Sequence, residues 1–143
     1  MPLAGTLVIW YQVTMTDAEL LARFEALTLP PTEFRHREHV RLAFAMLAEE
    51  ADFAAAAQRY RTALRRFATN AGVPGKYHET ITWAYLALVH QRMHEHPCAA
   101  SLELLERCPE LLDHRGGALA RHYDVGAITA SEVARRIFVL PER

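Results

Sequence analysis

Residues 76–82, KYHETIT, place a lysine, a tyrosine, a histidine, a glutamate and two threonines directly after a break rich in glycine and proline. The residues that follow are almost entirely apolar, as expected for a helix of the core. A core helix rarely begins with so many reactive side chains. A histidine next to a glutamate can serve general acid–base catalysis or metal coordination. We therefore expect a functional site at this end of the helix.

A second group of histidines begins the helix expected over residues 33–50. One face of that helix is an apolar stripe with two histidines at its N-terminal end, composed of His36, His39, Val40, Ala43, Met46 and Leu47. At helical spacing His36 and His39 are neighbours on the inward face. Arg37 and Arg41 are predicted on the opposite, solvated face.

A metal site is the first interpretation of these histidines. If the helices that begin near His36 and His78 are parallel neighbours, then His36, His39 and His78 can meet. Three histidines with an open fourth position form catalytic zinc sites, and zinc, iron or manganese are the candidate metals. Glu79 would be a further ligand or a general base. Burial and the helix dipole favour the neutral imidazoles that bind metals.

Two other interpretations stay open. In the first, a metal-free pocket uses His78 and Glu79 to bind or deprotonate a small polar molecule. In the second, the protein is an interaction or scaffold protein, and its histidine cluster is only structural. The small-molecule hypotheses also predict ligand contacts from Lys76, Tyr77, Thr82 and Tyr85. An enzyme of this kind would be a small hydrolase or lyase, but HxxH spacing alone does not establish enzymatic activity.

The fold predicted from the hydrophobic pattern is all-α, a compact bundle of four longer helices plus short C-terminal helices. We expect the longer helices over about residues 16–29, 33–50, 52–70 and 77–95. Helix starts are indicated by Thr16 with Glu19, by Asp52, by Ser101, and by Thr129 with Glu132. Residues 15–143 are expected to form a single helical domain. Residues 1–14 are expected to be an N-terminal arm or strand, with strand-like composition at residues 7–13, and are a candidate contact for a homodimer.

Composition narrows the function classes. The chain has 143 residues and a formal net charge of −1, which favours neither a nucleic-acid partner nor an anionic membrane. Its two cysteines form no CxxC pair, so a reduced, cytoplasmic setting is expected. The carboxylates near the histidines are too few for a di-iron bundle site. Histidines that rank lower as candidates are His90, His94, His96, His114 and His122.

The segments FRHREHVRLAFAML and GKYHETITWAYL together resemble a group of small bacterial proteins of unassigned activity. That family has an FxHxxHxxxA segment, a YHETxT segment and a closing phrase similar to ARRIFVLPER. The resemblance covers about residues 16–143. It implies that His36, His39, His78 and Glu79 form one constellation, without implying what they do.

Overall fold

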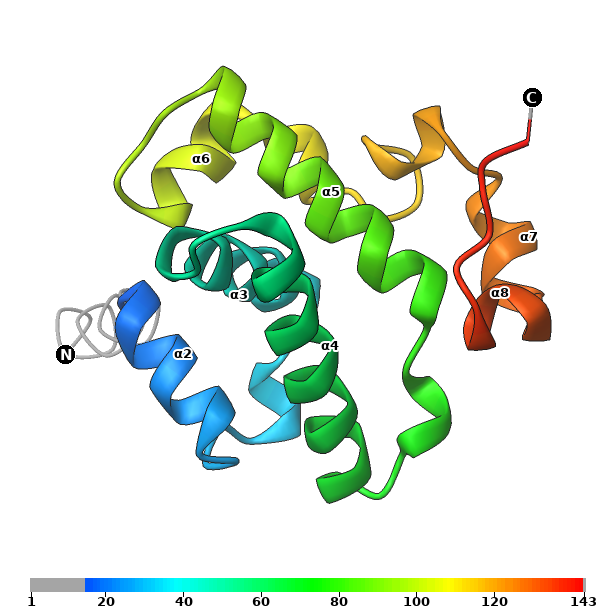
Figure 1. Ribbon diagram of the computed structural model, residues 1–143, viewed down its shortest axis with the longest axis horizontal. Coiled ribbons are helices and arrows are strands. Elements are labelled where there is room, and N and C mark those ends of the chain that lie inside the picture. The colour runs from blue at the N-terminus through cyan, green and yellow to red at the C-terminus, as the bar shows by residue number, and fades with distance from the viewer. Residues whose placement is uncertain (1–14, 143) are drawn as a thin grey trace, which may run out of the picture.

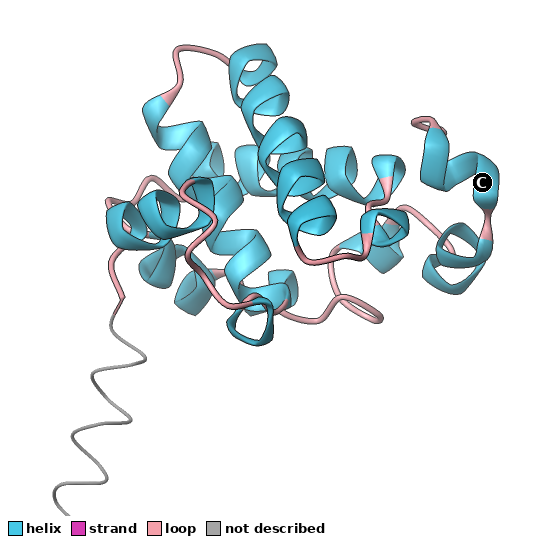
Figure 2. Ribbon diagram, turned by 90° about the horizontal axis from the view of Figure 1, so that it is seen from below, coloured by secondary structure: helices cyan, strands magenta, loops and turns pink. Residues whose placement is uncertain are grey.

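The computed structural model describes residues 15–142, and helices alone make up its regular structure in that range (Figure 2). The predicted all-α fold is thereby confirmed. The strand considered for residues 7–13 lies outside the described residues. The α-helices are α2 (Asp17–Glu25), α3 (His36–Glu49), α4 (Phe53–Asn70), α5 (Glu79–Glu95), α6 (Ser101–Arg107), α7 (Val125–Ala130) and α8 (Glu132–Arg136). Four 3-10 turns join them: η1 (Pro31–Glu33), η2 (Pro74–Lys76), η3 (Pro109–Leu111) and η4 (Leu119–Arg121). None of the helices in the described range is long and apolar enough to cross a membrane.

Two of the longer helices begin where a short polar side chain accepts a backbone hydrogen bond. Thr16 caps α2 and Asp52 caps α4, as predicted, each accepting the N–H three residues further on. α3 begins later than expected because residues 31–33 form the turn η1 instead of the first helical turn. α5 is capped by the imidazole of His78. Both histidine motifs therefore stand at helix starts.

Two predicted caps in the C-terminal part were wrong. The N-cap of α6 is Ala100, and Ser101 is its first residue, because the Ser101 side chain is used in a contact with α2. Residues 129–132 do not open one helix. Asp124 caps α7 and Ser131 caps α8, so two short helices meet where one start was expected.

The core is one buried cluster centred on α3, which packs against α2, α4, α5 and α6. Its fully buried members include Leu20, Phe24, Leu42, Met46, Tyr60, Leu86, Val89, Leu104, Leu111 and Leu119. α2 lies at one end of the long axis, and α7 and α8 lie at the other (Figure 1). The middle of the molecule is thus the place where α3, α4 and α5 converge.

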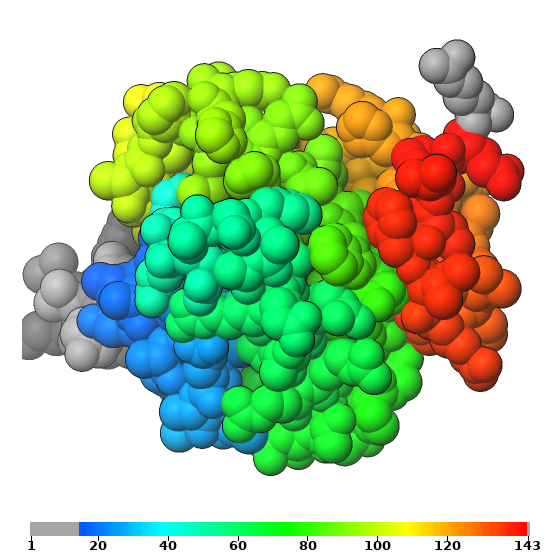
Figure 3. Space-filling view, viewed as in Figure 1, coloured from blue at the N-terminus to red at the C-terminus, as the bar shows by residue number. Residues whose placement is uncertain are grey.

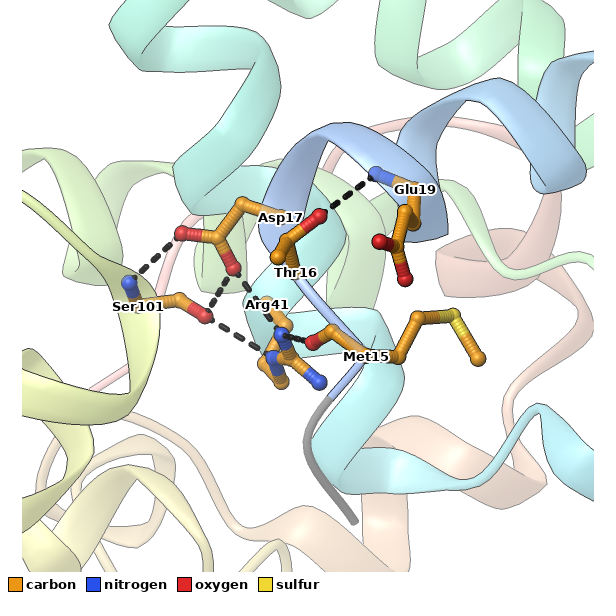
Figure 4. A network of polar contacts seen from close by, with 6 residues as sticks. All are labelled: Met15, Thr16, Asp17, Glu19, Arg41 and Ser101. Atoms are coloured by element: carbon orange, nitrogen blue, oxygen red, sulfur yellow. Dashed lines mark hydrogen bonds and ion pairs between the residues drawn. The ribbon is translucent and has the colours of Figure 1, made fainter. Parts of the chain in front are cut away.

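The prediction that Arg41 lies on a solvated face was wrong, because its side chain is only 5 % exposed. It donates from Nε to Ser101 Oγ at 2.9 Å, and its Nη2 lies 3.1 Å from Asp17 Oδ1 and also donates to the Met15 carbonyl (Figure 4). Ser101 donates to the Asp17 carboxylate from both its backbone N–H and its hydroxyl. This Arg41 cluster (Met15, Asp17, Arg41 and Ser101) joins α2, α3 and α6. Helical periodicity did not identify it, because periodicity places polar residues outward by default.

The C-terminal residues pack against the start of α5 (Figure 3). Thr80 is fully buried, and its Oγ1 lies 2.7 Å from the Ala134 carbonyl oxygen and 2.9 Å from that of Ile137. The same oxygen accepts the Val139 N–H at 3.1 Å. One threonine of the KYHETIT stretch therefore holds the chain after α8.

Candidate functional site

The first turns of α3 and α5 border one cavity of about 440 Å³. The two helices are neighbours, which was the condition for the two histidine motifs to meet, and the cavity collects nearly all the predicted site residues. It is lined by His36, His39, Lys76, Tyr77, His78, Thr82 and Tyr85. Glu79 is absent from the lining. The structure therefore brings the two histidine motifs to one place and leaves the predicted general base outside the cavity.

Both ring nitrogens of His78 form hydrogen bonds with backbone groups. Its Nδ1 accepts the Ile81 N–H at 3.1 Å, and its Nε2 donates to the Ile128 carbonyl of α7 at 2.8 Å. These partners fix the neutral tautomer that carries its proton on Nε2. Burial lowers the pKa of His78 and the positive charge of Arg135 lowers it further, while the Ile128 hydrogen bond opposes the shift. His78 can take up a proton or a metal only by giving up one of these backbone contacts.

Glu79 is held by a cation outside the cavity. Arg61 of α4 binds it with two hydrogen bonds, of 2.9 and 2.8 Å, and the Tyr77 hydroxyl donates to it at 2.6 Å. Burial raises the pKa of Glu79, but the hydrogen bonds from Arg61 and Tyr77 outweigh burial, so the net pKa lies below its usual value. A carboxylate stabilised in this way is a weak base. Its contacts instead tie α5 to α4.

The two threonines also serve the fold. Thr82 donates to the His78 carbonyl one turn back at 2.7 Å, and Thr80 holds the C-terminal residues. The polar residues 77–82 thus connect the start of α5 to α4, α7 and the chain end. Their close spacing reflects a junction of four segments, and the junction forms one wall of the cavity.

His36 and His39 line the cavity from the first turn of α3. The His36 Nε2 donates to the Leu111 carbonyl at 2.7 Å, so its Nδ1 is an acceptor when the ring is neutral. Burial lowers the pKa of His36, and the Leu111 hydrogen bond opposes this shift. The His39 ring packs on Phe34 with 4.0 Å between ring centroids. Burial, with a smaller effect of His36, lowers the pKa of His39 to about 3. His39 is therefore neutral at pH 7.

Tyr85 is the lining residue whose polar group lacks a partner. The side chain is buried, with 6 % of its surface exposed, and its hydroxyl finds no hydrogen bond among residues 15–142. Its ring stands edge-on to His36, with centroids 4.8 Å apart. Burial raises the pKa of Tyr85 to about 12, with a smaller contribution from Asp113, so the hydroxyl keeps its proton. Leaving a buried hydroxyl unpaired costs about 1–3 kcal/mol, which makes such groups rare.

Several lining residues were not predicted from the sequence. They are aromatic, aliphatic or histidine residues from distant segments, namely Phe34, Tyr60, Leu64, Phe67, His114, Leu119 and Val125. The rings of Phe24, Phe34 and Phe67 pack against one another with centroids 4.5–4.9 Å apart. The sequence could not single out the apolar members, because an apolar pattern is the same for a core and for a pocket wall. His114 gave no signal beyond its residue type.

The metal hypothesis gains no support from this geometry. In the described part of the chain no three histidine, cysteine or acidic side chains are grouped so that they could hold a metal ion. His36 and His78 each direct a ring nitrogen to a backbone carbonyl. Coordination by zinc, iron or manganese stays a prediction that elemental analysis can test.

Comparison of the chain with protein-family models, curated proteins and solved structures finds no match. The resemblance to small bacterial proteins with FxHxxHxxxA and YHETxT segments likewise stays a prediction.

Proposed function

We propose that this protein binds a small aromatic molecule in the cavity between α3, α4 and α5, without a metal. The observation that carries the proposal is Tyr85, which lines the cavity and whose buried hydroxyl has no partner in the described chain. A ligand atom that accepts a hydrogen bond would satisfy this hydroxyl. The interaction would recover the cost of burying it unpaired.

The size and walls of the cavity support a flat ligand. A volume of about 440 Å³ lies in the range of roughly 300–1,000 Å³ that is usual for small-molecule sites. The lining includes the rings of Phe34, Tyr60, Phe67, Tyr77 and Tyr85. Aromatic rings favour stacked or edge-to-face partners, so a planar ring system is the best complement.

The protonation states of the walls support a neutral group at the buried end of the ligand. The Tyr85 hydroxyl is protonated, and His39 is neutral because its pKa is about 3. Neutral His39 offers one donor and one acceptor. A ketone, amide or ring nitrogen matches these groups, whereas a buried cation would meet no carboxylate in the lining.

A matched pair of probes tests the proposal. 2-Acetylnaphthalene carries a carbonyl acceptor, and 2-ethylnaphthalene has nearly the same shape without it. We expect the ketone to bind the wild-type protein about tenfold more tightly, as measured by calorimetry, in line with one hydrogen bond. Tyr85→Phe should make the two affinities equal.

Tyr123→Phe is the control, because Tyr123 donates to the Val139 carbonyl and does not line this cavity. It should keep the preference for the ketone. No binding of either probe, or a preference that survives Tyr85→Phe, would count against the proposed function.

A further inference from the structure

One residue sets the charge of the cavity lining. Of the twenty lining residues, Lys76 is the only lysine, arginine, aspartate or glutamate. Lys76 is exposed, whereas Tyr85 is buried. No ion pair within residues 15–142 involves Lys76. The lining thus combines buried aromatic side chains with one exposed lysine.

Further positively charged side chains lie near the turn that carries Lys76. Arg65 lies over the Tyr77 ring, with its Cζ 5.4 Å from the ring centroid. A shallow hollow on the far side of Tyr77 is lined by Arg65, Arg135 and Arg136. Arg135 donates to the Gly75 carbonyl at 2.8 Å, which fixes the turn η2 that carries Lys76. The position of the lysine is therefore supported by the fold.

The nearby carboxylates already have partners. Glu79 is bound by Arg61, and Asp113 accepts the backbone N–H groups of Arg115 and Gly116. Glu132, in the neighbouring hollow, lies 3.6 Å from Arg135. An anion arriving at the Lys76 ammonium would displace none of these contacts.

We infer that the ligand is a small aromatic anion, with its acidic group held by Lys76 and its ring system inside the cavity. This inference rests on the proposed function and adds the class of the ligand to it. A carboxylate on a flat body with a neutral acceptor at the far end combines all three features of the site. The ammonium of Lys76 would donate to the carboxylate in a charge-assisted hydrogen bond.

Three probes of one shape test the inference: 6-acetyl-2-naphthoate, its neutral primary amide and its cationic aminomethyl analogue. We expect the wild-type protein to bind the carboxylate about fivefold more tightly than the amide at low salt, since Lys76 is exposed to solvent. The aminomethyl compound should bind most weakly. The preference for the carboxylate should shrink as salt is added.

Lys76→Met should remove the preference for the carboxylate and leave the affinity for the amide unchanged. Arg66→Met is the matched control, because it removes an exposed positive charge that does not line the cavity. This control should keep the preference. If the amide binds as tightly as the carboxylate and Tyr85→Phe still weakens both, the inference is wrong and the proposed function stands. If none of the three probes binds, the proposed function itself fails.

Discussion

The Arg41 cluster and the cavity are both polar regions inside a helical protein, but they differ in how their hydrogen bonds are completed. In the Arg41 cluster the arginine, the carboxylate and the serine are each bonded to the other two. In the cavity the Tyr85 hydroxyl has no partner in the described chain, and Lys76 has no counter-charge there. A network in which every polar group has a partner joins helices, whereas an unpartnered polar group is free to bind a ligand. Polar composition alone would not separate the two regions.

The largest effect is expected where the Arg41 cluster is broken. Arg41→Met should lower the free energy of unfolding by about 3 kcal/mol, because it leaves the Asp17 carboxylate with no cation in a mostly buried site. Urea denaturation measures the change. Arg37→Met, on the same helix, should stay within about 0.5 kcal/mol of the wild type. A similar small change for Arg41→Met would mean that the cluster does not hold α2, α3 and α6 together.

We expect His39, which lines the cavity, to make the stability of the fold depend on pH. The pKa of His39 is about 3 in the folded state against 6.5 as the ordinary value, so the unfolded chain takes up this proton first as the pH falls. The stability linked to neutral His39 is complete above about pH 6.5 and is lost progressively toward pH 3. At about pH 5 the loss is on the order of 2 kcal/mol.

His39→Gln should remove that part of the decline between about pH 7.5 and pH 5 in denaturant titrations. His94→Gln, at an exposed position near the end of α5, controls for the loss of any histidine. The pKa values of His36 and His78 are lowered in the same direction by burial, so the variant should retain a smaller decline. An unchanged slope in His39→Gln would contradict the neutral, buried state of this ring.

Removing a single hydroxyl from each region compares them directly. Ser101→Ala should lower the free energy of unfolding by about 1–2 kcal/mol, because Arg41 and Asp17 both lose a partner. Tyr85→Phe removes a hydroxyl that has no partner, so stability should be unchanged or higher by up to about 1 kcal/mol. Thermal or urea unfolding of the two variants gives the answer. If Tyr85→Phe destabilised the protein as much as Ser101→Ala does, the Tyr85 hydroxyl would have a hydrogen-bond partner in the folded protein, as the Ser101 hydroxyl does.

The smallest effect is expected from metal removal. The ketone probe should bind equally well before and after dialysis against a chelator. Elemental analysis of the wild type beside His36→Ala/His39→Ala completes the test. Near-stoichiometric zinc, iron or manganese that disappears in the double variant would favour the metal hypothesis over the metal-free pocket.

The parts of the fold that sequence predicts are those decided locally. The all-α class follows from apolar spacing, and Thr16 and Asp52 cap their helices with side chains that reach only three residues ahead. The gathering of both histidine motifs at one place was expected only if α3 and α5 are neighbours, and the structure shows that they are.

The partner of each polar side chain was beyond prediction. Arg41 bonds to Ser101 sixty residues away, and His78 bonds to Ile128 fifty residues away. Sequence spacing gives no measure of such distances. For the same reason the sequence suggested that Glu79 is a free general base, whereas in the structure Arg61 donates two hydrogen bonds to it. Residue types indicated where the candidate site lies, and the hydrogen bonds show which of those residues already have partners within the fold.

The attachment of α7 to His78 has a consequence for synthesis of the chain. Val125 and Thr129 of α7 form part of the cavity wall, and this helix is synthesised after α2 to α6. Because chains fold from the N-terminal side during translation, the contacts of α3 with α2, α4, α5 and α6 can form before α7 completes the cavity wall. Competence to bind a ligand should therefore appear late, as a separate event after the core has formed.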